Sequence, residues 1–200
     1  MTSGHRHWQL ADGWISPRHD DGVSILNRSE RQQISLERLE SDLSATAFFS
    51  GMSPTHVKLL AACANRTHSA AGDFIFRQGE TANRFYLIEA GTVQLEAFAR
   101  PGGRTIVVDT LGPGRLLGWS WLFEPYEWQF TARALSETSA IFFYGTVLRE
   151  YCANDPSLGF ELFQRMSRVM VKRLQSARRR LLEGKSAYSP VGEEHALSED

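Results

Sequence analysis

The sequence predicts a mainly β domain, an antiparallel barrel or sandwich, flanked by helices. Two patterns lead to this fold class. Short apolar strands alternate with glycine-rich turns through the middle of the chain, and apolar residues recur at helical spacing toward both ends. The chain has 200 residues, of which 42% are hydrophobic and 22% are charged. These values are typical of one globular domain with extensions.

The N-terminal stretch 1–45 is polar and is expected to be a flexible extension. Its one expected ordered element is a short amphipathic helix near 34–43, where apolar residues recur at helical spacing. A second helix is expected to begin at Pro54, because Ser53 is a good N-cap and proline suits the first helical position.

Residues 70–145 carry the strand pattern. Glycine-containing turns such as Pro101–Gly102–Gly103 separate short runs that alternate between apolar and polar residues. Regular spacing of such runs favours an antiparallel barrel or sandwich. The expected strands cover residues 73–76, 85–89, 92–99, 105–111, 130–135 and 139–144.

The C-terminal third is expected to be helical. A short helix is predicted at 147–153, and Asp155–Pro156–Ser157 provides a cap for a long helix that ends near Glu183. The apolar seam of this helix extends over about five turns, which is longer than packing against one small barrel requires. We therefore favour a parallel helix pair in a homodimer over a helix packed only on its own barrel. The predicted seam consists of Phe163, Met166, Met170, Leu174, Ala177 and Leu181.

The segment Ala71–Glu96, AGDFIFRQGETANRFYLIEAGTVQLE, has a specific pattern of glycines and aromatic residues. Gly72, Gly79 and Gly91 stand at tight turns between strands, where a residue without a side chain is favoured. The segment resembles the cyclic nucleotide-binding domain family, in particular the sensor domains of the cAMP receptor protein and FNR-like bacterial regulators. The resemblance covers about residues 46–184.

This resemblance implies the organisation of the chain. A cyclic nucleotide-binding-like β-roll of eight antiparallel strands is expected at 46–155, and a long dimerisation helix at 156–184. Residues 185–200 are acidic and are expected to be a disordered tail.

Residues 111–134 correspond to the phosphate-binding cassette of the family. The resemblance implies that a short helix follows Gly118 and offers its free N–H groups to a cyclic phosphate. At the positions of the family's glutamate and arginine, this chain has Trp119 and Trp128. Because charge-assisted hydrogen bonds contribute ~1.5–3 kcal/mol each, losing two weakens binding ~100-fold to ~10,000-fold. Tight cAMP binding in the usual manner is therefore not expected.

The cassette is instead rich in aromatic residues, six of them between positions 119 and 130. One interpretation is an altered but open pocket that stacks a planar or apolar ligand. The other is a closed cassette, in which Trp119 and Trp128 fill the volume of the former ligand. We favour the altered pocket. The candidate ligand-binding residues are Leu117, Gly118, Trp119, Ser120, Trp128, Gln129, Arg133 and Arg115.

The favoured function is a non-catalytic small-ligand sensor or regulatory module that signals through its dimer helix to a separate effector protein. One alternative is a ligand-free, degenerate roll that acts as a dimerisation or docking module. Another is a weak or atypical cyclic nucleotide binder, in which Arg115 or Arg133 replaces the missing arginine. No phosphate-binding loop, nucleophile elbow or metal-ligand spacing is present, so no enzyme activity, metal or cofactor is expected.

The overall composition limits the possible partners. The net charge of −1 excludes a globally basic nucleic-acid binder. Only 16 residues follow Gly184, too few for a recognition helix, so direct sequence-specific DNA binding is not expected. The sequence has no apolar run of the ~20 residues that span a bilayer, no signal sequence and only 2 cysteines, which favours a cytoplasmic protein away from membranes.

Overall fold

The computed structural model describes residues 28–98 and 105–183. Its contacts divide the chain into two units, Met1–Ser35 and Leu36–Asp200. Of the first unit the structure describes residues 28–35, which are helical. The flexible stretch expected before residue 28 and the acidic tail expected at 185–200 lie outside the described residues.

The described residues form four α-helices and eight strands, in the order expected for a roll followed by a long helix. The helices are α1 (Arg28–Ala45), α2 (Pro54–Ala62), α3 (Gly145–Asn154) and α4 (Pro156–Leu182), with a short 3-10 helix, η1 (Ser120–Leu122). The strands are β1 (Ala64–Ser69), β2 (Phe74–Phe76), β3 (Arg84–Ala90), β4 (Val93–Phe98), β5 (Thr105–Leu111), β6 (Leu116–Leu117), β7 (Thr131–Ala134) and β8 (Thr138–Tyr144).

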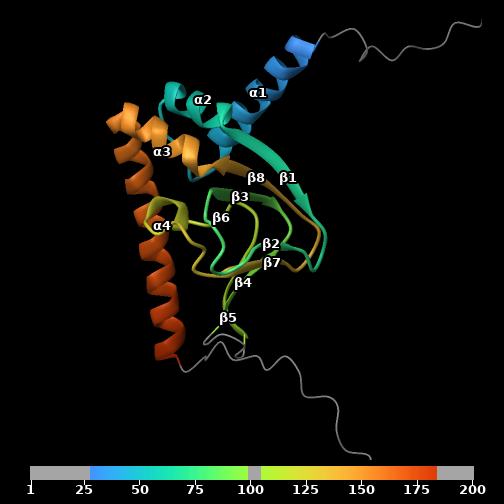
Figure 1. Ribbon diagram of the computed structural model, residues 1–200, viewed down its shortest axis with the longest axis vertical. Helices are drawn as coiled ribbons and strands as arrows, with labels where there is room; N and C mark the ends of the chain where they lie inside the picture. Colours follow the sequence, from blue (N-terminus) through green and yellow to red (C-terminus); the bar gives the residue numbers. More distant parts are fainter. Residues whose placement is uncertain (1–27, 99–104, 184–200) are drawn as a thin grey trace, which may run out of the picture. The chain divides into compact units, whose positions relative to one another are not determined.

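The strands form two four-stranded sheets, ordered β1-β8-β3-β6 and β2-β7-β4-β5, and every described pair of neighbours is antiparallel (Figure 1). The expected antiparallel roll is therefore confirmed. Strand β3 shows why the sequence folds this way. Phe85 and Leu87 are buried against the helices, while Tyr86 and Ile88 are buried between the sheets. Successive side chains of β3 point to opposite faces of its sheet, so the strand contributes to two separate hydrophobic cores.

Three elements differ from the sequence prediction: helix α1, strand β1 and the two-residue strand β6, which was not predicted. Helix α1 is longer than the predicted segment 34–43, because it begins at Arg28. Strand β1, with sequence ANRTHS, was not predicted. It is an edge strand that pairs only with β8 among the described strands, and most of its side chains are not buried. It therefore lacks the apolar alternation on which a sequence-based assignment depends.

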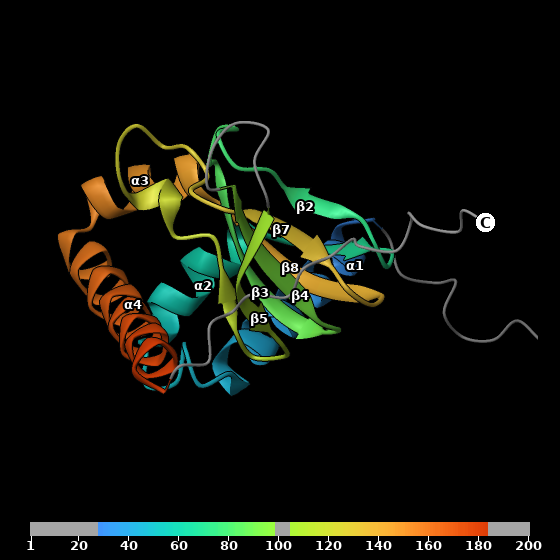
Figure 2. The same ribbon diagram turned by 90° about the horizontal axis from the view of Figure 1, so that it is seen from below.

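Helix α4 runs beside the roll (Figures 1 and 2). As expected, Asp155 is its N-cap, and the carboxylate accepts hydrogen bonds from the backbone N–H groups of Ser157 and Leu158. The first half of the helix is held by burial, because Leu158, Leu162 and Met166 pack in the core between the helices and the sheet. Its second half contributes fewer buried side chains, and these lie next to the cassette.

Candidate functional site

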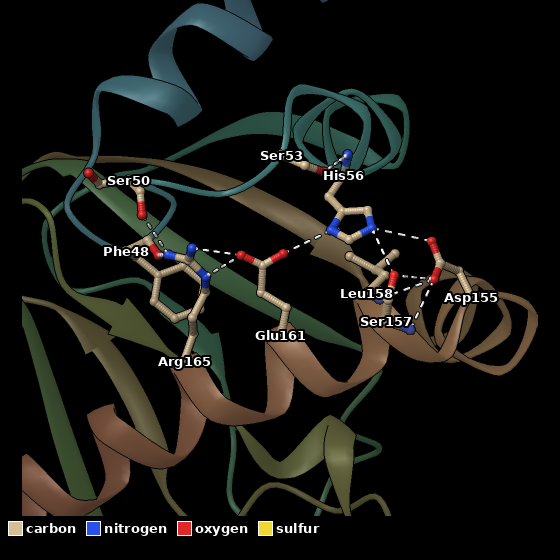
Figure 3. A network of polar contacts seen from close by, with 9 residues as sticks. All are labelled: Phe48, Ser50, Ser53, His56, Asp155, Ser157, Leu158, Glu161 and Arg165. Atoms are coloured by element: carbon tan, nitrogen blue, oxygen red, sulfur yellow. Dashed lines mark hydrogen bonds and ion pairs between the residues drawn. The ribbon is translucent and has the colours of Figure 1, made fainter.

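A polar network holds the start of α4 against α2 (Figure 3). The imidazole of His56 on α2 lies between two carboxylates, 3.3 Å from Asp155 and 2.8 Å from Glu161. Arg165 binds Glu161 at 2.8 Å and donates to the carbonyl of Ser50 at 3.0 Å. Burial raises the pKa of Glu161, but hydrogen bonds from His56 and Arg165 outweigh it, so the net shift is downward. The network fixes the end of α4 that lies away from the cassette.

The cassette begins with a sharp turn at Gly118, which has a φ of +82°. The helix expected to follow is only the three-residue 3-10 helix η1. It ends at Phe123, whose backbone is extended, while Trp121 is fully buried and stacks on Phe85 at 5.5 Å. The prediction of a helix N-terminus for anions at 117–120 is therefore wrong, because a single 3-10 turn offers no such array of free N–H groups.

Trp128 fills the interior of the cassette. Its side chain is 4% exposed and stacks on Phe76 with ring centroids 3.9 Å apart and an interplanar angle of 12°. A Cβ atom at Gly118 would lie 2.6 Å from the Trp128 ring, so only glycine fits beneath it. The cavity left between these residues and Trp119 measures about 10 Å³. The closed interpretation therefore holds for Trp128.

Trp119 lies elsewhere, on the wall of a second cavity of about 270 Å³ between the cassette and α4. Its ring meets that of Phe130 edge to face, with centroids 6.4 Å apart. We call this cavity the α4 cleft. It is lined by Leu95, Val108, Asp109, Trp119, Phe130, Met170, Arg173, Leu174, Ala177 and Arg180. The closed interpretation thus fits Trp128, which is a core residue, and the open interpretation fits Trp119, which lines a cavity.

Arg173 is a charged residue that lies over the ring of this tryptophan. Its guanidinium lies 4.9 Å from the centre of the Trp119 ring and donates a hydrogen bond to the carbonyl of Leu116. The residue is 9% exposed, and its Nε has no hydrogen-bond partner within the part of the chain that the structure describes. The pKa of Arg173 is lowered to about 10, mainly by burial; the charge of Asp109 opposes this shift and that of Arg115 contributes to it.

Sequence analysis does not identify Arg173 as a site residue. It resembles the other cations of α4, which are expected to be solvated. The one available signal is its position directly before Leu174 and three residues after Met170, beside apolar seam positions. A cation at that point of an amphipathic helix lies at the edge of the buried face.

The remaining candidate residues are not brought together. Arg133 lies on β7 between Ala132 and Ala134, which face the core, so it points to the opposite face of the sheet. There it pairs with Glu96 at 2.9 Å. The structure therefore does not place Arg133 in the interior of the cassette, where the sequence prediction put it. Arg115 is exposed in the turn before β6.

Three further candidate ligand-binding residues lie away from the α4 cleft. The side-chain amide of Gln129 is exposed and donates to the carbonyl of Glu127 at 3.3 Å. Leu117 is buried between the sheets, and Ser120 is 7% exposed in η1. None of the three lines the α4 cleft.

The predicted seam of α4 is partly exposed. Phe163, Leu174 and Leu181 are 49%, 71% and 79% exposed, whereas Met170 and Ala177 are half-buried beside the cleft. Met166 does not belong to the seam, because it is 2% exposed in the core of its own roll. The corrected set, called the α4 stripe, is spaced alternately by three and four residues: Phe160, Phe163, Ser167, Met170, Leu174, Ala177 and Leu181.

Other kinds of site were sought in the part of the chain that the structure describes. It contains no group of three or more residues that could hold a metal ion. None of the helices there is long and apolar enough to cross a membrane. The two cysteines are free thiols, and burial raises the pKa of Cys63 to about 12, which removes its reactivity near neutral pH.

Comparisons with known proteins agree with this architecture. Residues 66–155 match the model of the family described as cyclic nucleotide-binding domain. A CRP-like cAMP-activated global transcriptional regulator of Mycobacterium tuberculosis is 26% identical over 137 residues, which are 68% of this chain. The chain spans 59% of the length of that regulator.

Two further proteins are similar to parts of this chain. The crystal structure of the Thermus thermophilus catabolite activator protein is similar with a TM-score of 0.55 and 25% identity, over 69% of this chain and 62% of that chain. The acetyltransferase Pat of Mycolicibacterium smegmatis is 37% identical over 78 residues, which are 39% of this chain and 23% of that enzyme. Similar domains therefore occur within proteins of different activity.

Proposed function

We propose that the chain, whose residues 66–155 match the cyclic nucleotide-binding domain family, is a non-catalytic ligand sensor whose ligand binds in the α4 cleft. Binding changes the position of α4, and a separate effector protein responds to that change. The ligand has an anionic group for Arg173 and a flat apolar part for Trp119.

The observation that carries this proposal is the state of Arg173. The guanidinium is 9% exposed and has lost most of its hydration, and its Nε has no hydrogen-bond partner among the described residues. Burial of a charge is costly, and a bound anion would add to the favourable charge of Asp109 and provide the missing partner. The adjoining ring of Trp119 provides a surface on which a planar group stacks.

The filled cassette argues against the usual cyclic nucleotide pose. Trp128 occupies the interior next to Gly118, and the space that remains there is about 10 Å³. Arg133, the arginine that could replace the family's phosphate ligand, is paired with Glu96 on the far face of its sheet. A ligand therefore binds outside the cassette interior, against α4.

The α4 stripe supports a homodimer. Its spacing is that of a two-stranded coiled coil, and its large members are exposed in the single chain. Met170, Leu174 and Ala177 belong both to the stripe and to the wall of the α4 cleft. A ligand that moves this wall also changes the helix pair, which provides a route from the site to an effector.

The test is thermal unfolding of the purified chain against cyclic mononucleotides, cyclic dinucleotides and linear nucleotides. A ligand at one hundred times its dissociation constant adds ~2.7 kcal/mol of stability. The shift should disappear in Trp119→Ala and Arg173→Met and persist in Arg168→Met, which removes an exposed cation of the same helix. A shift that survives both cleft variants would contradict the proposed site.

The filled interior favours a second candidate, a ligand-free roll that serves as a dimerisation or docking module. Trp128 is then simply a core residue that replaced the ligand. This candidate predicts a dimer in sedimentation experiments and no thermal shift with any compound of the panel. Trp119→Ala and Arg173→Met would then leave binding of the effector protein unchanged.

A further inference from the structure

Another cavity, of about 510 Å³, opens on the edge of the roll formed by β1 and β2. We call it the edge groove. Figure 1 shows β1 on the side of the roll opposite α4, and the groove shares no lining residue with the α4 cleft. Most of its lining side chains are polar. The lining residues are Thr67, His68, Ser69, Gly72, Asp73, Phe74, Ile75, Arg77, Arg84 and Tyr86.

Two arginines lie in the edge groove, and aromatic rings cover the face of each guanidinium. Arg77 lies 3.8 Å from the centre of the Phe74 ring. Arg84 lies 4.5 Å from the ring of Phe142 and 5.4 Å from that of Tyr144. Stacking of this kind fixes the plane of a guanidinium but leaves the N–H groups along its edges free to donate. The rings thus prepare both side chains to bind an anion in the plane of the guanidinium.

Neither arginine forms an ion pair with another described residue. The Nε of Arg84 is buried without a hydrogen-bond partner within residues 28–98 and 105–183. The one acidic residue of the lining, Asp73, accepts a hydrogen bond from the backbone N–H of Ala70 at 2.8 Å. Glu80, next to the groove, accepts from the backbone N–H of Arg77.

Polar groups complete the groove around the two cations. His68 and the hydroxyl-bearing residues Thr67 and Ser69 stand on β1, and Tyr86 stands beside Arg84 on β3. Burial raises the pKa of Tyr86, although the charge and hydrogen bond of Arg84 oppose the shift. The phenol is therefore protonated at neutral pH and can donate a hydrogen bond.

We infer that the edge groove binds a small phosphate-bearing molecule, whose oxygens accept hydrogen bonds from Arg77 and Arg84. Two arginine forks match the geometry of a multivalent oxyanion, and charge-assisted hydrogen bonds of this kind are among the strong ones in proteins. The groove is large enough for a group of several oxygens together with part of its carrier. This second site is independent of the ligand proposed for the α4 cleft.

The experiment uses the full chain and pyrophosphate as the probe, at constant ionic strength. Calorimetric titration gives the affinity, and backbone amide NMR shifts locate the binding. We expect the largest shifts in residues 67–77 and 84–86. Arg84→Gln and Arg77→Gln should each weaken binding about tenfold or more. Arg168→Gln, the same change on exposed α4, should leave the affinity unchanged.

Three results would overturn the inference: no binding at millimolar pyrophosphate, shifts confined to another surface, or equal affinity in all three variants. Arg77 is exposed, so its variant tests the site even where Arg84→Gln disturbs folding. Trp119→Ala separates this inference from the proposed function. That variant should lose the thermal response assigned to the α4 cleft and keep its affinity for pyrophosphate.

Discussion

Replacing Trp128 by alanine tests the conclusion that this side chain is core rather than a ligand-stacking surface. The indole is 4% exposed and lies flat against Phe76. A tryptophan buries ~200 Å², which at ~25 cal/mol per Å² corresponds to about 5 kcal/mol. Because alanine keeps part of this burial and the surroundings relax, we expect a loss of ~3–5 kcal/mol.

The backbone of Trp128 makes this a clean side-chain experiment. Its N–H donates to the carbonyl of Glu80 and its carbonyl accepts from the N–H of Gly79, both at 2.9 Å. These bonds persist in the alanine variant, so the loss measures packing alone. Urea unfolding of the variant gives its free energy, and added indole should recover part of the stability, as an apolar ligand fills an apolar cavity.

Trp119→Ala is the matched control. Trp119 is half-buried, with an edge contact to Phe130 and a cation–π contact to Arg173, so its truncation should cost only ~1 kcal/mol. The reasoning would be refuted by Trp128→Ala losing less than Trp119→Ala. It would also be refuted if indole failed to stabilise the Trp128 variant more than the wild type.

Three further predictions concern the turn of the cassette, the anchor of α4 and its exposed stripe. Gly118→Ala should cost ~2–4 kcal/mol in urea unfolding, since φ is +82° and the added Cβ would lie 2.6 Å from the Trp128 ring. Gly114→Ala, with φ of +74° but no atom within 4 Å, should show the smaller backbone penalty alone, and equal losses would contradict the contact. Glu161→Gln should destabilise the chain at neutral pH. Because the folded pKa of Glu161 is lowered from 4.5, its contribution is present above that value and is lost as the pH falls through the folded pKa. The stability difference from the wild type should therefore shrink in acid, and a difference that grows below pH 4.5 would refute the role. Leu174→Glu places a charge in the α4 stripe at a residue that is 71% exposed, and sedimentation should show a monomer that remains folded. An unchanged sedimentation coefficient would exclude the stripe as the dimer interface.

The fold could be predicted from the sequence because its signals are local. Alternation and glycine turns mark strands such as β3 and β4, and Asp155 with Pro156 marks the start of α4. Strand β1 escaped prediction because an edge strand with exposed side chains carries no apolar alternation. What holds it is the pairing with β8, a strand about seventy residues further along the chain, and that partner cannot be read from six residues.

The site was less predictable, because its parts come from distant segments. The family resemblance identified Trp119 and Trp128 as substitutions but could not tell which ring is core. That difference depends on whether Phe76, from another strand, lies against the ring. Arg173 looked like any solvated cation of a helix, and only the packing of α4 beside the cassette buries it. Met166 shows the reverse case, a residue with the spacing of a partner seam that packs on its own roll.

The position of Met170 connects the two proposals made for α4. It is half-buried in the wall of the α4 cleft and also falls in the register of the α4 stripe. A helix fixed at its start by the His56 network and bordered by a cavity near its end is free to change position mainly at that end. If ligand and partner helix both contact this segment, linkage requires each to alter the affinity of the other by the same factor. The dimerisation constant should therefore change on adding a ligand of the α4 cleft by the same factor as the ligand affinity changes between monomer and dimer. Unequal factors would show that the α4 cleft and the α4 stripe are not coupled.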